Sequence, residues 1–339
     1  LKAIGAEKLE LLLRTPSSAI GTSRDSLEVE DYDRMAEVIA RHRIQYVFIN
    51  GGNGSMDACG KVYKACKRRG MGTSVIGIPK TMDNDIAVTD HTPGYGSAAR
   101  YMAASAAELC CDVVGLPIHV VVLEAMGRSA GWAAAAAALA ADCGLPGPDL
   151  IYVPERAFEE ERFLTDVEEL IRRRGCGVVV VSEGLRDASG KPVAEPVLTM
   201  GRAIYYGNVA EKLAGLILKR LNYKARSERP GILSRASIAW QSETDRKEAV
   251  MTGREAVRAA VAGNTGVMVG FRREKGDDYR VQTVMIPIEK VMLTEKRLPD
   301  RFINERGNGM TREFQEWCRP LLGGPLPRFV SFTAQEDLY

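Results

Sequence analysis

Apolar and polar positions alternate along the chain in two rhythms, one typical of helices and the other of buried strands. From Val29 to His42 the apolar residues recur at three- and four-residue steps, which predicts an amphipathic helix. A β-rich run at Ile44–Ile49 is then broken by a glycine turn, and a helical pattern at Ser55–Arg69 leads to a second apolar run at Val75–Ile78. Strand, glycine turn, helix and strand in this order predict a βαβ unit.

This rhythm continues through the middle of the chain and predicts an α/β fold of mostly parallel sheets with helices on both faces. Ligands of such sheets bind beyond the carboxyl ends of the strands. Polar residues stand at those points after four of the predicted strands, which favours a binding cleft. The polar segments are Asn50–Ser55, Pro79–Asp85, Glu124–Arg128 and Ser182–Gly184, and the further helices predicted are Ser97–Cys111, Gly131–Ala141, Glu159–Arg174 and Val209–Leu221.

Composition narrows the class of protein. The 339 residues predict two domains, since a domain averages roughly 150 residues. The 46 basic and 44 acidic residues nearly balance, so neither nucleic acid nor an anionic membrane is the expected partner. The longest apolar run, around Trp132, is mostly alanine and falls short of the roughly 20 residues that span a bilayer. With no signal peptide visible, we expect a cytoplasmic protein.

The glycine turn Gly51–Ser55 lies between a predicted strand and a predicted helix. Glycines let the backbone approach a ligand closely, and the unpaired N–H groups at a helix N-terminus suit a phosphate group. A tight turn with no ligand explains the same residues equally well. The turn is not a Walker A loop, because no Gly-Lys-Ser/Thr follows it.

A denser polar cluster follows the next strand, between Lys80 and Asp85. In extended geometry the side chains of Asp83 and Asp85 face the same way. One carboxylate could accept a proton from a substrate hydroxyl while the other holds a metal ion, and Lys80 could neutralise a transferring phosphoryl group. The alternative is a solvated Asp-Asn turn, which the position after a buried strand disfavours.

Other strand ends carry single charged residues. Arg128 offers a planar fork for phosphate oxygens, although arginines also form many surface salt bridges. Glu183 suits either sugar hydroxyls or a helix cap. Arg24, Arg226 and Arg235 are weak candidates when each is taken alone.

Taken in order, these strand ends resemble the phosphofructokinase family. The block Pro79–Asp85 with a downstream Met126–Arg128 is highly specific, and the resemblance extends through Arg235. It implies Mg²⁺-dependent transfer of a phosphoryl group to the 1-hydroxyl of fructose 6-phosphate, giving fructose 1,6-bisphosphate in glycolysis. Such a transfer requires positioning and charge stabilisation more than covalent chemistry.

The resemblance also implies roles for individual residues. Asp83 matches the general base that accepts the hydroxyl proton, Glu183 an acid that binds sugar hydroxyls, and Arg226 a 6-phosphate ligand supplied by a neighbouring subunit. The expected catalytic residues are Lys80, Thr81, Asp83 and Arg128; the donor residues are Arg24, Gly52, Asn53, Gly54 and Ser55; the sugar-phosphate residues are Thr81, Asp83, Asp85, Met126, Gly127, Arg128, Glu183, Arg226 and Arg235; and the metal ligands are Asn53 and Asp85.

The chain departs from the family pattern at three places. Nothing in Leu1–Ser26 matches the strand and glycine-rich loop with which the family usually opens, so we expect that segment to lie before Leu1. Asn53 stands where many members have a Mg²⁺-binding aspartate, and an amide oxygen is a neutral, weaker ligand. His119 stands where many members have an arginine for the 6-phosphate, and a neutral imidazole would bind a dianion less firmly.

Two positions bear on the phosphoryl donor. Pyrophosphate enzymes of the family carry an aspartate at the position of Gly54, where its carboxylate occupies the place of the α-phosphate of ATP. Gly54 leaves that space open, whereas Lys80 is typical of pyrophosphate enzymes and also occurs in an ATP-using branch. The steric consideration favours ATP, with a pyrophosphate-dependent fructose 6-phosphate 1-phosphotransferase as the alternative. A non-catalytic regulatory paralogue that binds sugar phosphate is a hypothesis of another class.

The resemblance further implies two Rossmann-like lobes with a cleft between them. We expect a lobe that binds the donor, ATP or pyrophosphate, over residues 1–95 and 234–287. The fructose 6-phosphate lobe is expected over residues 96–233 and 288–339. Because Arg226 would complete a neighbour's site, a homodimer or homotetramer is expected.

Overall fold

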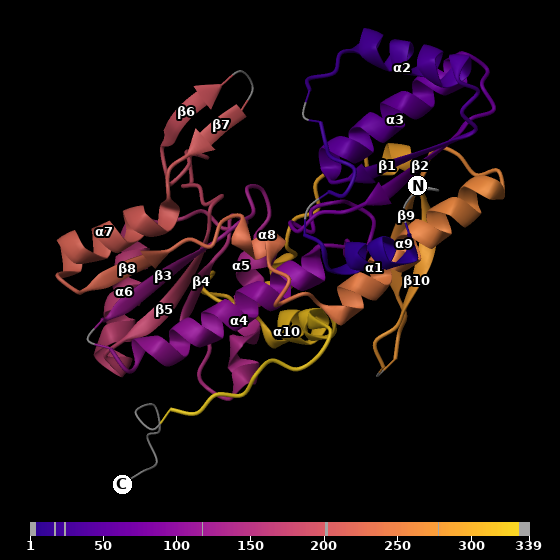
Figure 1. Ribbon diagram of the computed structural model, residues 1–339. Coiled ribbons are helices and arrows are strands. Elements are labelled where there is room, and N and C mark those ends of the chain that lie inside the picture. Colours follow the sequence, from indigo (N-terminus) through magenta and orange to yellow (C-terminus); the bar gives the residue numbers. More distant parts are fainter. Residues whose placement is uncertain are drawn as a thin grey trace. The chain divides into compact units, whose positions relative to one another are not determined.

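The chain forms two compact units, shown in a computed structural model (Figure 1). Unit 1 comprises Leu1–Tyr95 and Glu243–Lys296, and unit 2 comprises Gly96–Ser242 and Arg297–Tyr339. The residues that the structure describes are 5–16, 18–23, 25–116, 118–200, 203–276 and 278–331.

The boundaries between the units fall later in the chain than the sequence suggested, at 242/243 and 296/297 instead of 233/234 and 287/288. Ser242 belongs to unit 2 because its hydroxyl donates to the carbonyl of Leu321 at 2.7 Å and its N–H to the hydroxyl of Ser97 at 3.1 Å. The segment before Lys296 belongs to unit 1 because Glu295 forms a β-bridge with Ile86.

Unit 1 is built on a four-stranded sheet in the order β1-β2-β9-β10. The first three strands are parallel and β10 is antiparallel to β9. The central strand β2 is buried on both faces and accordingly reads as an almost continuous apolar run, whereas no residue of the edge strand β1 is buried. The bounds are Tyr46–Gly51 for β1, Ser74–Pro79 for β2, Val267–Arg273 for β9 and Val281–Pro287 for β10.

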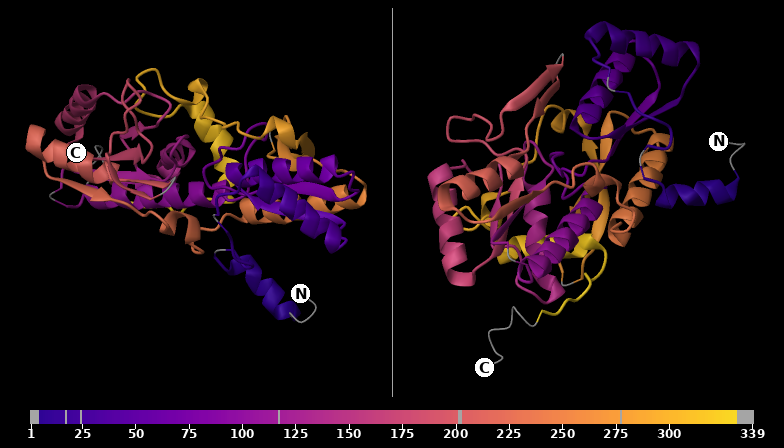
Figure 2. Two further views of the ribbon diagram at one scale, coloured as in Figure 1. Left: turned by 90° about the horizontal axis from the view of Figure 1, so that it is seen from above. Right: turned by 60° about the vertical axis from the view of Figure 1, so that its left-hand side comes forward.

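Helices cover both faces of this sheet. The helices α2 (Val29–Arg41) and α3 (Asn53–Arg68) lie side by side (Figure 1, Figure 2) and share a core with Val75. The neighbouring Ile76 points to the other face, where it packs with α9 (Glu243–Val261). The βαβ unit predicted from the first 80 residues is confirmed, with β1 beginning two residues later than expected.

Unit 2 contains a second four-stranded sheet in the order β4-β5-β3-β8, with every neighbouring pair parallel. One face of β3 and β5 packs with α6 and α7, and α5 contacts β3, β4 and β5. The strands are β3 (Val120–Ala125), β4 (Leu150–Tyr152), β5 (Gly177–Ser182) and β8 (Ala225–Glu228), and the helices are α4 (Tyr95–Val113), α5 (Trp132–Ala136), α6 (Glu160–Arg174), α7 (Val209–Leu221), α8 (Leu233–Ala236) and α10 (Arg312–Cys318).

The fold class predicted from the sequence, α/β with two mostly parallel sheets, is confirmed. The helix expected over Gly131–Ala141 is instead a short α-helix followed by a 3-10 helix over Ala137–Cys143. The antiparallel hairpin of β6 (Pro196–Met200) and β7 (Ala203–Tyr206), which projects from unit 2 in Figure 1, was not predicted.

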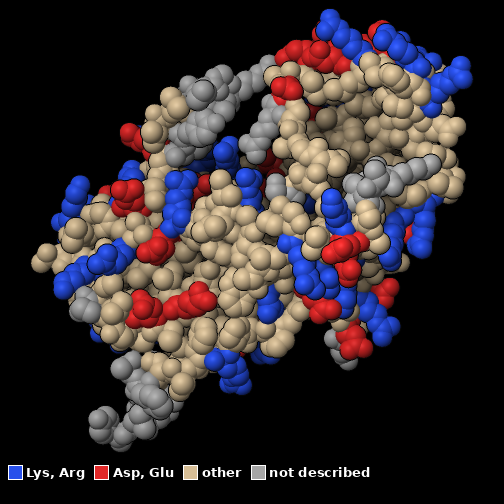
Figure 3. Space-filling model, viewed as in Figure 1, with Lys and Arg blue, Asp and Glu red and all other residues tan. Residues whose placement is uncertain are grey.

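The charges on the surface and the length of the helices concern two classes of partner, nucleic acids and membranes. Figure 3 shows basic and acidic side chains interspersed on the face in view, as the near balance of charges suggests. Over the described ranges, no helix combines the length and the apolar character needed to cross a bilayer.

Candidate active site

Two of the predicted polar segments meet at the carboxyl ends of β1 and β2 in unit 1. The N–H of Lys80 donates to the carbonyl of Gly51 at 2.8 Å. A Cβ on Gly52 would lie 3.5 Å from the Cβ of Thr81, so the glycine turn and the acidic cluster are in van der Waals reach. Gly52 is also the N-cap of α3, which directs the free N–H groups of that helix toward the same strand ends.

The side chain of Asn53 joins the glycine turn to the end of the acidic cluster. Its Nδ2 donates to the carbonyl of Asp85 at 3.0 Å and to Oδ2 of the same residue at 2.7 Å. Asn53 Oδ1 and Asp85 Oδ1 remain buried, and neither has a hydrogen-bond partner within the described ranges. Buried polar atoms are almost always satisfied in folded proteins. A cation would satisfy both oxygens.

These two oxygens fit a divalent metal ion of the Mg²⁺ type. Such an ion prefers oxygen ligands and is commonly held by one or two protein groups, water and substrate phosphates. In the part of the chain that the structure describes, no group of three or more His, Cys, Asp or Glu residues is arranged to hold a metal. An ion held by Asn53 and Asp85 therefore needs further ligands from water and from the substrates.

The segment from Asp83 to Asp85 is not extended, so the expectation that both carboxylates face one way through strand geometry is wrong. Asn84 between them has a φ of 52°, in the left-handed region that asparagine tolerates better than most residues. The N–H of Asp83 donates to Oγ1 of Thr81 at 3.1 Å, which turns the chain before Asn84. The two carboxylates are therefore oriented by a turn.

Lys296 holds this turn from far along the chain. Its buried ammonium group donates to Asn84 Oδ1 at 3.0 Å and to the carbonyls of Thr89 and Asp90 at 3.1 and 2.9 Å. Its N–H also donates to the carbonyl of Asp85 at 2.7 Å. Burial lowers the pKa of Lys296 to about 7, against the opposing effect of Asp90 and Asp85. Lys296 thus links the acidic turn to the segment that follows it.

A second buried group anchors the same segment to α9. His91 is 1% exposed, with Nδ1 2.8 Å from Asp90 Oδ2 and Nε2 2.6 Å from Glu248 Oε2. Tyr279 donates its hydroxyl to Glu248 Oε1 at 2.6 Å. Burial lowers the pKa of His91, but the hydrogen bonds and charges of Asp90 and Glu248 outweigh it and raise the pKa above 6.5. Because a carboxylate oxygen lies within hydrogen-bond distance of each ring nitrogen, the imidazolium form of His91, which has two N–H donors, satisfies both contacts and links the segment to α9.

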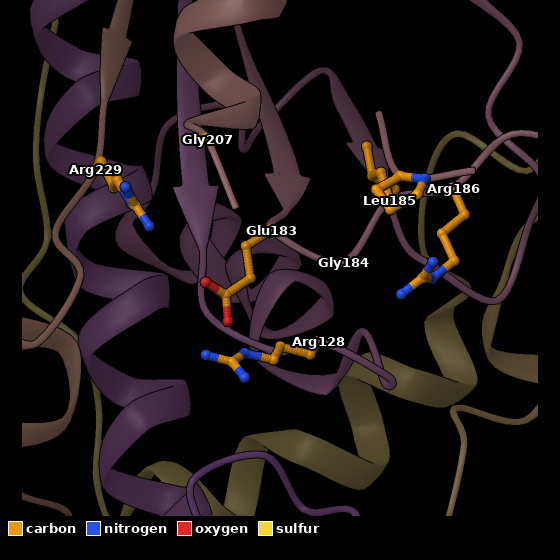
Figure 4. Close-up of a pocket in the computed structure, with 8 residues that line it drawn as sticks. Arg128, Glu183, Gly184, Leu185, Arg186, Gly207 and Arg229 are labelled. Atoms are coloured by element: carbon orange, nitrogen blue, oxygen red, sulfur yellow. The ribbon is translucent and has the colours of Figure 1, made fainter. Parts of the chain in front are cut away.

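In unit 2, a cavity lies at the carboxyl ends of β3 and β5 (Figure 4). Arg128 follows β3 and Glu183 follows β5, and both line the cavity as the sequence suggested. The N–H of Gly127 donates to Glu183 Oε1 at 3.2 Å, which fixes the carboxylate. The residues lining the cavity are Arg128, Glu183, Gly184, Leu185, Arg186, Pro192, Gly207 and Arg229.

Gly184 allows the two strand ends to approach this closely. A Cβ at this position would lie 2.1 Å from the carbonyl oxygen of Arg128, a backbone atom that cannot rotate away. We expect Gly184→Ala to lower the free energy of unfolding by about 1–3 kcal/mol, the usual cost of overpacking. Urea denaturation measures this. As a matched control, Gly215→Ala in α7 has open space for its Cβ and should be neutral or stabilising. Equal stability of the Gly184 variant and wild type would contradict the expectation.

The other predicted site residues lie elsewhere. Arg226 is exposed on the edge strand β8 and pairs with Val121, near the start of β3. Met126 directly follows β3, five residues beyond Val121, which is roughly 16 Å at the rise of a strand. Arg235 is exposed on α8 and is not among the residues that line the cavity. Arg24 lies outside the described residues.

His119 precedes β3 at the end away from the cavity. Its Nδ1 accepts the N–H of Lys224 at 3.0 Å, and its ring packs edge-on against Tyr223. His119 therefore lies where β3 and β8 begin, at the edge of the sheet away from the cavity.

Sequence reasoning missed two arginines of the cavity, Arg186 and Arg229. Each follows the end of a strand of the parallel sheet, β5 and β8 respectively. The rule that found Arg128, namely that ligand residues follow strand ends, could have found Arg186 after β5. It could not have found Arg229, because β8 is too short and too polar to be recognised as a strand from its sequence.

The phosphofructokinase family model matches residues 1–260. The chain is 39% identical over 333 residues to the pyrophosphate–fructose 6-phosphate 1-phosphotransferase of Xanthomonas campestris, covering 95% of this chain and 79% of that protein. It is similar to the crystal structure of pyrophosphate-dependent phosphofructokinase from Nitrosospira multiformis, with a TM-score of 0.87, 34% identity and coverage of 100% and 82% of the two chains. It is also 37% identical over 180 residues to the ATP-dependent 6-phosphofructokinase of Amycolatopsis methanolica, covering 51% and 38%. The chain belongs to the phosphofructokinase family and is a phosphotransferase.

Proposed function

We propose that the protein transfers a phosphoryl group from pyrophosphate to the 1-hydroxyl of fructose 6-phosphate with the help of a divalent metal ion. The observation that carries this proposal is the similarity, over nearly the whole chain, to a pyrophosphate-dependent enzyme. The ATP-dependent relative is similar over only about half of the chain. The proposal thus replaces ATP, which Gly54 favoured on steric grounds. An open space beside Gly54 permits ATP without requiring it.

The residues of unit 1 supply the acid–base part of the proposed chemistry. Asp83 accepts the proton of the attacking hydroxyl, and Lys80, exposed at the end of β2, neutralises charge on the phosphoryl group. Asn53 and Asp85 would hold the metal ion, which when bound neutralises phosphate oxygens. In unit 2, Arg128 and Glu183 bind the sugar phosphate, with the carboxylate of Glu183 accepting hydroxyl protons.

Self-association is part of the proposal. Arg226 lies opposite Val121 near the start of β3, away from the strand ends that carry Arg128 and Glu183, which supports its role as a ligand for the sugar phosphate of a neighbouring copy. A homodimer is the smallest assembly that allows this.

A coupled assay tests the proposal directly. Purified protein is supplied with fructose 6-phosphate, Mg²⁺ and either pyrophosphate or ATP, and fructose 1,6-bisphosphate is measured. We expect turnover with pyrophosphate that stops when the metal is chelated. Turnover with ATP alone would reject the proposed donor. Binding of fructose 6-phosphate without turnover from either donor would favour the regulatory paralogue.

A substitution at Gly54 tests which phosphoryl donor the site accepts. No described atom lies within 4 Å of a Cβ at this position, which is in the first turn of α3, so Gly54→Asp should fold normally. We expect kcat/KM with pyrophosphate to stay within about threefold of wild type and any turnover with ATP to fall at least about 100-fold, because the carboxylate excludes a nucleotide phosphate. Gly54→Ala serves as the control without charge. A Gly54→Asp variant that loses pyrophosphate turnover would contradict this prediction.

A further inference from the structure

Arg229 occupies the same edge of the unit 2 sheet as the residues already assigned to the sugar phosphate. It follows the last residue of β8, which runs parallel to β3 with Glu228 opposite Leu123. Arg229 is therefore level with Glu124, near the carboxyl end of β3. It lines the cavity together with Arg128 and Glu183, and Figure 4 shows it pointing toward the space around these two side chains.

A buried carboxylate holds Arg229 in this position. Nε of Arg229 lies 2.8 Å from Oε1 of Glu124, whose side chain is 2% exposed. The other oxygen, Oε2, accepts the N–H of Ala210 at 3.1 Å in the first turn of α7. A side chain tethered through Nε has lost much of its rotamer freedom and keeps its terminal nitrogens for a planar, two-point contact with an anion.

The charges around the cavity define the class of ligand. Three arginines, Arg128, Arg186 and Arg229, line the cavity with one glutamate, Glu183, and the carboxylate of Glu124 pairs with Arg229. The remaining excess of positive charge favours an anion such as a phosphate group, and Glu183 adds an acceptor for hydroxyl groups. His119 adds no cation here, because it lies at the far end of β3 with Nδ1 accepting a backbone N–H.

We infer that Arg229 binds the phosphate group of the sugar phosphate within the same subunit as Arg128 and Glu183, with Glu124 as its positioning residue. This inference rests on the proposed function, whose sugar-binding site it completes. It assigns to the edge strand β8 two different roles: Arg226 near its start is not among the residues that line the cavity, while Arg229 just past its end is.

Calorimetry with the full chain and no donor tests the inference apart from catalysis. Fructose 6-phosphate is titrated into wild type, Arg229→Met and Arg229→Lys, with inorganic phosphate as a second probe. We expect Arg229→Met to raise the Kd for fructose 6-phosphate about 10- to 100-fold, the loss of a charge-assisted contact, and Arg229→Lys to be intermediate. In turnover, KM for the sugar phosphate should rise while kcat and KM for the donor stay within about threefold, a split that a general loss of structure would not give.

Two further variants keep the test decisive. Arg229→Met leaves Glu124 buried without its cation, so the double variant Glu124→Gln/Arg229→Met removes both charges and should bind fructose 6-phosphate as weakly as the single variant. Arg220→Met, at the last turn of α7 and outside the cavity, should bind like wild type. If Arg229→Met or the double variant Glu124→Gln/Arg229→Met binds fructose 6-phosphate with wild-type affinity, the inference is overturned. Arg229-dependent binding without turnover from any donor would reject the proposed function and leave the inference standing, whereas no binding to wild type would reject both.

Discussion

Asp83→Asn should lower kcat by about 10²- to 10⁴-fold, the range that loss of a general base produces. The asparagine amide has nearly the same size but cannot accept the proton of the attacking hydroxyl. The local backbone should persist, because the contact that shapes the turn is made by the N–H of residue 83 to Thr81 Oγ1. Affinity for fructose 6-phosphate should therefore stay within a few-fold of wild type. Steady-state rates and calorimetry measure the two effects separately.

A matched control is Asp112→Asn, which removes an exposed carboxylate near the end of α4 and should leave kcat unchanged. The pH profile adds a second readout. If Asp83 is the base, the acidic limb of the wild-type profile should be absent from the residual rate of Asp83→Asn. An unchanged kcat in Asp83→Asn would remove Asp83 from the mechanism.

His91→Leu should lower the free energy of unfolding by about 3–5 kcal/mol, because it leaves the buried carboxylate of Glu248 and the partly buried carboxylate of Asp90 without the cation between them. The groups facing His91 from neighbouring elements are Asp90, Glu248 and Tyr279, with Arg273 paired to Asp90. In the variant, Arg273 still neutralises part of the charge of Asp90, but it does not pair with Glu248. Activity should fall with stability, since the same contacts anchor the segment that carries Asp83.

The effect of His91 should depend on pH with a definite sign. Burial lowers the pKa of His91 but Asp90 and Glu248 raise it further, so the folded protein holds the proton more tightly than the unfolded chain. The stabilisation is therefore fully present below pH 6.5 and is lost as the pH rises through the higher pKa of the folded state. Urea unfolding of wild type and His91→Leu between pH 5.5 and 9 should show the difference shrinking as the pH rises. His42→Leu, at an exposed position after α2, is the control and should differ from wild type by less than about 0.5 kcal/mol at every pH.

The sequence was most informative where a residue follows a predicted strand. Apolar runs located β1, β2, β3 and β5, and the rule that ligands bind beyond strand ends then singled out Asn53, Asp83, Arg128 and Glu183. The structure brings Asn53 to Asp85 and Arg128 to the cavity of Glu183. Local patterning suffices for such residues because the strand itself carries them to the site.

Residues that reach the site from distant parts of the chain were not predictable. Lys296 and Asn84 are 212 positions apart, and His91 and Glu248 are 157 positions apart. Neither pairing leaves a local signal, because each depends on how β9 and α9 return to the first sheet. The turn at Asn84 was missed for a related reason: besides the local bond from the N–H of Asp83 to Thr81 Oγ1, it is held by Lys296, which lies far along the chain.

The insertion of unit 2 between the two halves of unit 1 has a consequence for biosynthesis. Val75 of β2 bonds to Thr265, 190 positions later, and β9 follows at Val267, so the first sheet lacks this strand until it has left the ribosome. At about 5–20 residues per second this interval lasts roughly 10–40 s. During translation the acidic turn has neither Lys296 nor α9 to hold it, and a nascent or prematurely terminated chain that ends before Lys296 carries Asp83 without the contacts that hold this turn.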